Sequence, residues 1–307
     1  MISILFSGQG SQQENMGGDF YEKYEFSKNY YDNLESDLKD LILKGDLETL
    51  SKTKNTQPAL ISYQTMVSEL LKNENVKFDY TAGLSIGEYA SLAHSNVISS
   101  NEAIEIAKIR GGLMEEIGEK LNSKMVAVIG MDKIDIENIL SEVSNEKSKG
   151  EISNLNCPGQ IVVSGETEAI ERFIKLADDK ARRIIPINTS GPFHTSYLKP
   201  VEEKLREVLS NFEFKEEEET KVVYNLLGRE RKSDENPVEI MAKQVSNTVR
   251  FQESIEYQIE KGVDTFVEVG FGNVLKGFVR KIDKTKKVYV IDSVESYEKF
   301  LSEVKND

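Results

Sequence analysis

Cysteine and histidine are scarce in this sequence of 307 residues, and tryptophan is absent. The single cysteine, Cys157, excludes an internal disulfide framework and a CxxC metal site, and it fits the reducing environment of the cytoplasm. The two histidines, His94 and His194, are the only candidates for a mechanism that needs an imidazole. The longest apolar run, residues 125–131, is much shorter than the roughly 18 residues of a membrane span, and the N-terminus does not resemble a signal peptide.

Basic residues are fewer than acidic ones. Lys and Arg total 39 and Asp and Glu total 53, which gives a formal net charge of −14. Because no excess of cations is available to displace counterions from phosphates, we expect no nucleic-acid partner. Hydrophobic residues make up 38% of the chain. Its length corresponds to about two domains, or to one large domain with an insertion.

Predicted strands and helices alternate along most of the chain. Short apolar runs are typical of buried parallel strands, and apolar residues three and four positions apart indicate amphipathic helices. We expect strands at 2–6, 79–84, 222–225, 265–269 and 288–291, and helices at 57–71, 86–93, 197–209, 251–260 and 273–281, with a further helix that begins at the capping box Ser99–Glu102. The alternation predicts an α/β fold with a mainly parallel sheet, in which ligands bind beyond the carboxyl ends of the strands.

A separate pattern lies in the middle of the chain. Strands at 125–129, 152–155, 160–164 and 182–187 and helices at 133–143 and 166–176 follow the order βαββαβ, which is typical of a ferredoxin-like unit. We therefore expect an inserted small subdomain at residues 124–188 and a large subdomain built from residues 1–123 and 189–307.

The segment Gly83-Leu-Ser-Ile-Gly87 matches the motif G-x-S-x-G, and it lies between a predicted strand and a predicted helix. In this context the serine occupies a strained turn, and the flanking glycines remove side chains that would clash there. Ser85 is then a candidate nucleophile, and the amide of Ile86 faces the oxyanion that would develop. The alternative is a glycine-rich turn that binds nothing.

A serine nucleophile needs a base. His94 follows Ser85 by nine residues on the same helix, roughly 13 Å along the axis, and is expected at the helix C-terminus, where the helix dipole favours it. His194 lies in a constrained segment after a strand, so it is the candidate base; the alternative is a structural loop histidine. No acidic residue stands out as a third member, and a backbone carbonyl is the possible orienting acceptor.

Arg110 shares a helical stripe with Ala103, Ala107 and Met114. An arginine on an apolar face is costly unless an anion meets it. That anion is either a glutamate in a structural ion pair or the carboxylate of a substrate, which the guanidinium fork would bind. The loop Gly8–Gln12, after the first strand, has exposed amides that could supply a second oxyanion donor.

Seven blocks of this sequence together resemble the malonyl-CoA:acyl carrier protein transacylase family. They are found in order over nearly the whole chain: 6–12 (FSGQGSQ), 83–89 (GLSIGEY), 110–111 (RG), 156–165 (NCPGQIVVSG), 191–194 (GPFH), 244–249 (QVSNTV) and 268–275 (EVGFGNVL). The resemblance implies a large subdomain like that of α/β-hydrolases with a ferredoxin-like insert. It also implies malonyl-CoA and acyl carrier protein as partners.

The resemblance assigns roles to particular positions: Ser85 as the acylated nucleophile, His194 as its base, the amides of Gln9 and Ile86 as the oxyanion hole, Arg110 as the binder of the malonyl carboxylate, Gln244 as the residue whose carbonyl orients His194, and Phe193 as typical of malonyl-selective members. Three positions depart from the family pattern. Leu84 stands where His is frequent, and Thr248 and Phe271 stand where Pro is common.

The reaction expected from this resemblance is a two-step acyl transfer through a malonyl-serine ester, which supplies fatty acid biosynthesis in the cytoplasm. It uses no metal and no redox cofactor, and nothing in the sequence demands more than a monomer. Alternatives are the supply of polyketide synthesis, a serine hydrolase on a similar scaffold, and a non-enzymatic carrier-binding module. Two basic clusters are expected to flank the entrance for an acidic carrier protein: Lys180, Arg182 and Arg183, and Lys276, Arg280, Lys281, Lys284, Lys286 and Lys287.

Overall fold

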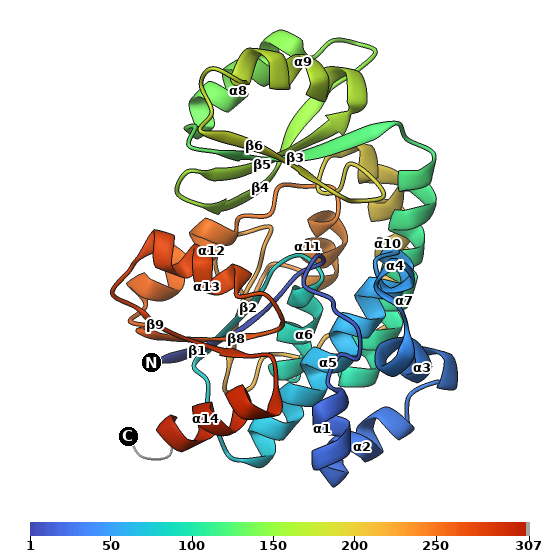
Figure 1. Ribbon diagram of the computed structural model, residues 1–307, viewed down its shortest axis with the longest axis vertical. Coiled ribbons are helices and arrows are strands. Elements are labelled where there is room, and N and C mark those ends of the chain that lie inside the picture. Colours follow the sequence, from blue (N-terminus) through green and yellow to red (C-terminus); the bar gives the residue numbers. More distant parts are fainter. Residues whose placement is uncertain (305–307) are drawn as a thin grey trace.

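Two separate sheets organise the chain, as the computed structural model of residues 1–304 shows (Figure 1). The larger sheet has the strand order β7-β2-β1-β8-β9, and every neighbouring pair is parallel. Its strands are β1 (Ile2–Phe6), β2 (Tyr80–Gly83), β7 (Lys221–Val223), β8 (Thr265–Val269) and β9 (Lys287–Ile291). The predicted α/β class with a parallel sheet is therefore confirmed.

Helices pack on this sheet and on one another. Near the start of the chain they are α1 (Gly18–Lys23), α2 (Glu25–Asp32), α3 (Ser36–Lys44), α4 (Leu47–Leu50), α5 (Thr53–Asn73), α6 (Gly87–His94) and α7 (Ser100–Glu119). Later helices are the short 3-10 helix η1 (Ser196–Leu198), α10 (Lys199–Leu209), α11 (Pro237–Gln244), α12 (Phe251–Glu260), α13 (Val274–Ile282) and α14 (Val294–Val304). The expected capping box closes the start of α7, where the Ser99 hydroxyl accepts from the Glu102 amide.

The smaller sheet lies at one end of the molecule, the upper end in Figure 1. Its strands are β3 (Ser123–Ile129), β4 (Gly150–Cys157), β5 (Gln160–Glu166) and β6 (Arg183–Ile187), in the antiparallel order β4-β5-β3-β6. The helices α8 (Lys133–Val143) and α9 (Thr167–Ala177) pack against it. In chain order this is βαββαβ, as the sequence pattern predicts.

Hydrogen bonds join the small sheet to the loop before α12. The amide of Val249 donates to the Ser153 carbonyl at 2.9 Å, and the Leu155 amide donates to the Val249 carbonyl at 2.9 Å. The Thr248 hydroxyl donates to the Ile152 carbonyl at 2.7 Å. A proline at position 248 has no such donor, so this departure from the family pattern adds a contact between the two parts of the molecule.

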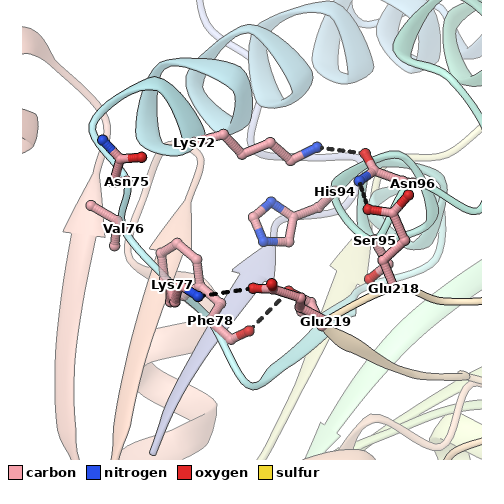
Figure 2. Close-up of a pocket in the computed structure, with 11 residues that line it drawn as sticks. Lys72, Asn75, Val76, Lys77, Phe78, His94, Ser95, Asn96, Glu218 and Glu219 are labelled. Atoms are coloured by element: carbon pink, nitrogen blue, oxygen red, sulfur yellow. Dashed lines mark hydrogen bonds and ion pairs between the residues drawn. The ribbon is translucent and has the colours of Figure 1, made fainter.

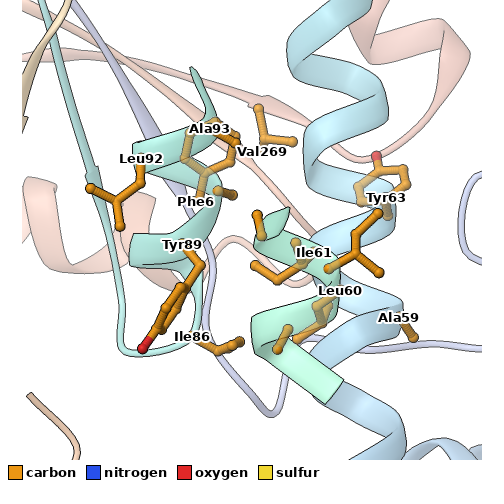
Figure 3. Close-up of a cluster of buried hydrophobic side chains, with 14 of the residues drawn as sticks. Phe6, Ala59, Leu60, Ile61, Tyr63, Ile86, Tyr89, Leu92, Ala93 and Val269 are labelled. Carbon is orange, nitrogen blue, oxygen red and sulfur yellow. The ribbon is translucent and has the colours of Figure 1, made fainter. Parts of the chain in front are cut away.

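One of the buried hydrophobic clusters lies between the parallel sheet and the helices α5 and α6. Figure 3 shows part of it, with Phe6 from β1, Leu60 and Tyr63 from α5, and Tyr89 and Leu92 from α6. All five side chains are fully buried. Burial of each large apolar side chain contributes about 1.5–3 kcal/mol to stability. This packing fixes α6 against the end of β1. The two loops that carry the candidate site follow β1 and β2 at this end of the sheet.

The candidate site follows from the register of the parallel strands. Phe6 at the end of β1 pairs with Gly83 at the end of β2 and with Val269 at the end of β8. Strand order changes direction between β1 and β8, because the chain builds outward to β2 and β7 on one side and to β9 on the other. Loops diverge at such a position and leave a crevice outside the carboxyl ends of the strands. The loop at Gly8 follows β1 at this position, and the loop at Ser85 follows the neighbouring strand β2.

Candidate active site

Ser85 occupies a strained turn between β2 and α6. Its φ is 54°, in the left-handed region that costs a non-glycine residue of the order of 1 kcal/mol or more. A Cβ atom at Gly83 would lie 2.0 Å from the Gly87 carbonyl carbon, and one at Gly87 would lie 2.3 Å from the Phe6 carbonyl oxygen. Glycine is therefore required at both positions. The structure has the strand–turn–helix geometry that the G-x-S-x-G motif predicts.

His194 lies against Ser85 although 109 residues separate them. The Nε2 atom of His194 is 2.6 Å from the Ser85 hydroxyl oxygen, and the Nδ1 atom is 2.9 Å from the main-chain carbonyl oxygen of Gln244. A carbonyl only accepts, so Nδ1 carries the proton and the Nε2 lone pair faces the hydroxyl. Burial, reinforced by the nearby Arg110 cation, lowers the pKa of His194 to about 3, so the ring is neutral at physiological pH.

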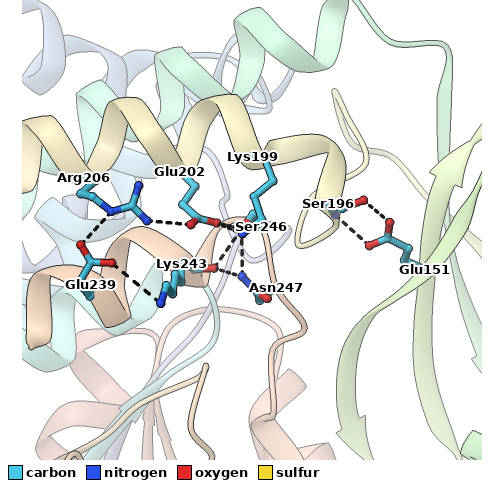
Figure 4. A network of polar contacts seen from close by, with 9 residues as sticks. All are labelled: Glu151, Ser196, Lys199, Glu202, Arg206, Glu239, Lys243, Ser246 and Asn247. Carbon is cyan, nitrogen blue, oxygen red and sulfur yellow. Dashed lines mark hydrogen bonds and ion pairs between the residues drawn. The ribbon is translucent and has the colours of Figure 1, made fainter. Parts of the chain in front are cut away.

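The loop that carries His194 is held between β4 and the pair α10–α11. His194 itself has a φ of 60°, and its amide donates to the Val245 carbonyl at 3.1 Å. Figure 4 shows the polar contacts around this loop. Glu202 on α10 binds the Ser246 hydroxyl beyond the end of α11, and Glu151 on β4 binds Ser196. These contacts join three elements around the loop and stabilise the position of the imidazole.

Arg110 on α7 is fully buried and points at the same serine. Its Nη2 atom donates to the Ser85 hydroxyl at 3.2 Å and to the Gln244 side-chain oxygen at 3.0 Å, and its Nη1 atom donates to the Gln57 side-chain oxygen at 2.9 Å. Its Nε atom has no hydrogen-bond partner within residues 1–304. The guanidinium forms no direct ion pair with a carboxylate there, and the buried Glu88 carboxylate interacts with it electrostatically without contact.

Two backbone amides border the space in front of the nucleophile. Gln9 and Ile86 both line the pocket that contains Ser85 and His194, and within the described part of the chain neither main-chain N–H donates a hydrogen bond. The Gln9 side chain is fixed separately, because it donates to the Thr53 hydroxyl at 3.0 Å. Two free donors beside the Ser85 hydroxyl are the arrangement that an oxyanion requires.

This pocket lies between the parallel sheet and the small sheet. Residues from the small sheet, from the loop after β1 and from α13 form its walls. Examples are Met125, Asn154, Gln160, Val162, Pro186, Gly8, Gln12, Val274 and Phe278. Leu84 and Phe193 also line it, and Phe193 is 5% exposed. Phe271 stands where the family commonly has Pro, and the centroid of its ring lies 4.7 Å from the centroid of the Tyr63 ring.

Three polar residues of this region were not predicted as site residues. Glu88 is fully buried and accepts from the Asn225 main-chain amide at 3.0 Å and from the Gln244 side-chain nitrogen at 2.7 Å. Asn225 accepts from the Ser85 amide at 2.8 Å, and Gln57 is a partner of Arg110. A signal for Glu88 exists in the sequence, since it is the one carboxylate in the helix GEYASLAH, which is buried throughout. Asn225 and Gln57 give no such signal.

His94 lies at the end of α6, away from Ser85, in the wall of a different cavity (Figure 2). Its Nδ1 atom is 2.8 Å from the Ser68 hydroxyl, and Phe6 and Phe78 pack around the ring. Burial lowers the pKa of His94 to about 3, with a further contribution from Lys72. His94 is thus at the helix C-terminus as expected, but the helix dipole does not explain this position, because a neutral imidazole gains little from the dipole.

Residues 1–304 contain neither a metal-binding cluster nor a membrane-spanning helix. No group of three or more His, Cys, Asp and Glu side chains there has the arrangement of a metal site. No helix there has both the length and the apolar character needed to cross a membrane. Cys157, at the end of β4, is buried and does not line the Ser85 pocket.

Comparisons with known proteins agree with each other. A family model described as "Acyl transferase domain" matches residues 4–301. The malonyl CoA-acyl carrier protein transacylase of Bacillus subtilis (strain 168) is 36% identical over 311 residues, which cover 100% of this chain and 98% of that protein. The crystal structure of malonyl CoA-acyl carrier protein transacylase from Clostridium perfringens is 35% identical, with a TM-score of 0.93 and coverage of 99% of this chain and 97% of that one. A further structure is a type II PKS acyl-carrier protein in complex with its malonyl-transacylase, and its matching chain is 31% identical, with a TM-score of 0.93 and coverage of 98% and 99%.

Proposed function

Because this chain belongs to the acyl transferase family, we propose that Ser85 carries the acyl group during turnover and that His194 acts as its base. The protein transfers a malonyl group from malonyl-CoA to the phosphopantetheine thiol of acyl carrier protein. The contact of 2.6 Å between the serine hydroxyl and the neutral imidazole is the observation that carries the assignment of roles.

The first half-reaction acylates the serine. Nε2 of His194 takes the hydroxyl proton while Oγ of Ser85 forms a bond to the thioester carbon of malonyl-CoA. The carbonyl oxygen becomes an oxyanion, which accepts hydrogen bonds from the main-chain amides of Gln9 and Ile86. The carbon–sulfur bond then breaks, CoA leaves as a thiol with the proton held by His194, and a malonyl ester remains on Ser85.

Arg110 binds the free carboxylate of that ester. Its guanidinium contacts Ser85 Oγ, so the carboxylate of a malonyl group on this oxygen lies within its reach. A buried cation with only neutral hydrogen-bond partners favours an anionic acyl group over a neutral one. Gln244 holds both catalytic partners, since its carbonyl accepts from His194 Nδ1 and its side-chain oxygen accepts from Arg110. Phe193 limits the space beside the acyl group and favours the unbranched malonyl chain.

The second half-reaction reverses these steps with a different thiol. His194 deprotonates the phosphopantetheine thiol of the carrier, the thiolate attacks the ester carbon, and Ser85 regains its proton as the ester bond breaks. Thioester and ester exchange of this kind balances without an oxidant or reductant, so we propose that the enzyme needs no metal or redox cofactor. We place the reaction in fatty acid biosynthesis in the cytoplasm. We also propose that the protein is a monomer and that residues 124–188 form its small subdomain.

Polyketide supply is a second candidate, because the chain is also similar to a malonyl-transacylase bound to a type II PKS acyl-carrier protein. A panel of fatty acid and polyketide carriers, compared by kcat/KM for malonyl transfer, distinguishes the two pathways. A fatty acid carrier is expected to be the better acceptor.

The assignment of roles is tested by trapping the ester. Incubation with malonyl-CoA and mass spectrometry of the digested protein should show malonyl on the peptide that contains Ser85, and addition of carrier protein should remove it. Ser85→Ala should form no ester. Release of free malonate without a carrier would instead indicate a hydrolase, and a folded wild-type protein that forms no ester would refute the role of Ser85.

A further inference from the structure

Glu88 is a buried carboxylate beneath the nucleophile that the two half-reactions do not use. It is the second residue of α6 and has no exposed surface. Its Oε1 atom accepts from the Asn225 main-chain amide at 3.0 Å, and its Oε2 atom accepts from the Gln244 side-chain nitrogen at 2.7 Å. Both oxygens therefore face donors.

The two partners of Glu88 are the residues that hold Ser85. Asn225 Oδ1 accepts from the Ser85 amide at 2.8 Å, and Asn225 Nδ2 donates to the Gly83 carbonyl at 2.6 Å. Gln244 Nε2 also donates to the Ser85 carbonyl, at 2.8 Å. The strained turn is thus bound at its amide, at its carbonyl and at the strand end before it.

Glu88 also fixes which way the Gln244 amide points. The NH₂ group of Gln244 faces two acceptors, the Glu88 carboxylate and the Ser85 carbonyl, and its oxygen faces the Arg110 guanidinium. If this amide turned over, its oxygen would face the Glu88 carboxylate and its NH₂ group would face the Arg110 cation, and both contacts would be repulsive. The carboxylate therefore selects one orientation.

We propose that Glu88 is the positioning residue of this active site: through Asn225 and Gln244 it holds Ser85 and Arg110 in their reactive arrangement. The inference rests on the proposed function only in its kcat assay, which uses malonyl-CoA as substrate. The geometric part does not depend on the identity of the acyl group.

The test is Glu88→Gln, which keeps the size of the side chain. The Asn225 main-chain N–H cannot turn, so the new amide must offer it the oxygen and must point its own NH₂ at the NH₂ of Gln244. Gln244 then turns over or moves, and Ser85 and Arg110 each lose a partner. Loss of hydrogen bonds to a charged group predicts a decrease in kcat of about tenfold to a hundredfold with an unchanged fold.

Glu268→Gln is the matched control. Glu268 is equally buried and also accepts two N–H groups, those of Leu275 and Lys276 at the start of α13. It is expected to lose stability without a comparable decrease in kcat. If Glu88→Gln keeps kcat within about twofold of wild type, or if Glu268→Gln decreases kcat equally, the proposal is wrong.

A second readout uses the labelling rate of the nucleophile by a fluorophosphonate, which needs no malonyl group. Glu88→Gln should slow labelling of Ser85 by a similar factor. Normal labelling with lost malonyl transfer would refute the positioning role. If the wild type is labelled but accepts no malonyl from malonyl-CoA, the proposed function fails, while the labelling comparison still tests Glu88.

The pH dependence of labelling in the wild type gives a third readout that needs no folded variant. Burial raises the pKa of Glu88 to about 7, and a protonated carboxyl no longer offers two acceptors. Nearby groups do not titrate in this range: Arg110 remains charged, burial raises the pKa of Tyr89 to about 12 and that of Tyr224 further, and the pKa of His194 is lowered to about 3. Labelling should therefore slow as pH falls through 7 in the wild type. A flat profile from pH 8 to pH 5 would contradict the proposal.

Discussion

Arg110 is the residue on which acyl selectivity should depend. It is fully buried, its hydrogen-bond partners are neutral, and its Nη2 atom contacts the Ser85 hydroxyl oxygen. Arg110→Ala should decrease kcat/KM for malonyl-CoA by about a hundredfold, which corresponds to a few kcal/mol of lost charge pairing, and should leave acetyl-CoA little affected. Acylation rates for the two thioesters measure the ratio.

Arg110→Lys is the matched variant for this prediction. It keeps the charge but loses the planar fork, so its preference for malonyl should lie between those of wild type and Arg110→Ala. An unchanged ratio of malonyl to acetyl transfer in Arg110→Ala would show that the arginine does not bind the substrate carboxylate.

His94 should make the fold sensitive to acid. Its pKa is lowered to about 3 by burial, whereas an unfolded histidine has a pKa of about 6.5. Between these values the unfolded state binds a proton that the folded state does not, so stability is present above pH 6.5 and is lost as pH falls. Between pH 7 and pH 5, the free energy of unfolding should decrease by about 2 kcal/mol less in His94→Gln than in wild type. Urea unfolding at both pH values measures the two decreases.

A second buried histidine provides the comparison for this prediction. The pKa of His194 is lowered in the same direction and to a similar value, again mainly by burial. His194→Gln should therefore reduce the acid sensitivity by a similar amount, although it removes activity. An identical pH dependence of stability in wild type and His94→Gln would contradict the argument.

At the scale of single residues, the sequence indicated the side chains that meet at the pocket better than the groups behind them. Ser85 was recognisable from a local motif and His194 from the scarcity of histidine. Asn225 was not, because its contacts with Ser85 and Gly83 span about 140 residues and an asparagine in a loop has no distinctive pattern. The partners of Arg110 also required the fold, since its hydrogen bonds go to the side-chain oxygens of Gln57 and Gln244, which are distant in sequence.

Among the elements, α10 and α11 should be coupled through one buried carboxylate. Glu202 on α10 binds Lys199 at 2.6 Å, Arg206 at 2.8 Å and the hydroxyl of Ser246 (Figure 4). Glu202→Ala should decrease the free energy of unfolding by about 1.5–3 kcal/mol, as expected for lost hydrogen bonds to a charged group. Because Ser246 follows Gln244 by two residues, kcat should decrease as well.

Glu203→Ala is the control on the same helix, since Glu203 is exposed to solvent. Its effect on unfolding should stay within about 0.5 kcal/mol, as for other exposed positions. Equal unfolding midpoints for Glu202→Ala and wild type would show that the contact contributes nothing to holding α10 and α11 together.

Several elements with a clear periodic pattern were predicted well, whereas α11, the eleven-residue α14 and the short helices near the start of the chain were not. Strand β8 and helices α8 and α12 have the expected bounds, and α13 begins one residue later than expected. The four helices α1–α4, in contrast, were not predicted. They have 4 to 9 residues each, so they present few turns of an apolar stripe, and packing on α5 stabilises several of them. Tertiary contacts of this kind are not visible in a local window.

For the whole molecule, the sequence predicted two units but not how they meet. The order βαββαβ identified the small sheet, whereas the contacts of Thr248 and Val249 with β4 depend on residues that are almost 100 positions apart. The pocket has walls from both parts of the molecule, so its shape also depends on how they meet. The sequence also predicted that two basic clusters flank the pocket entrance, but not which elements they would share with the pocket wall.

Both basic clusters share an element with the pocket wall. On α13, Val274 and Phe278 line the pocket, and Arg280 is exposed a short distance further along the helix. On β6, Pro186 lines the pocket, and Arg183 is exposed at the start of the strand. Local positive charge at an entrance can attract an acidic partner even when the net charge of the protein is −14.

Charge reversal at this entrance should therefore slow transfer to the carrier protein and leave the first half-reaction intact. Arg183→Glu and Arg280→Glu are each expected to decrease kcat/KM for an acidic carrier by about fivefold at low salt, the effect of one exposed charge pair and its reversal. Acylation of Ser85 by malonyl-CoA, measured separately, should change little. Lys28→Glu on α2, an exposed lysine at the opposite end of the molecule from the small sheet, is the control (Figure 1). Equal losses in both half-reactions, or the same loss in Lys28→Glu, would show that the two clusters do not guide the carrier.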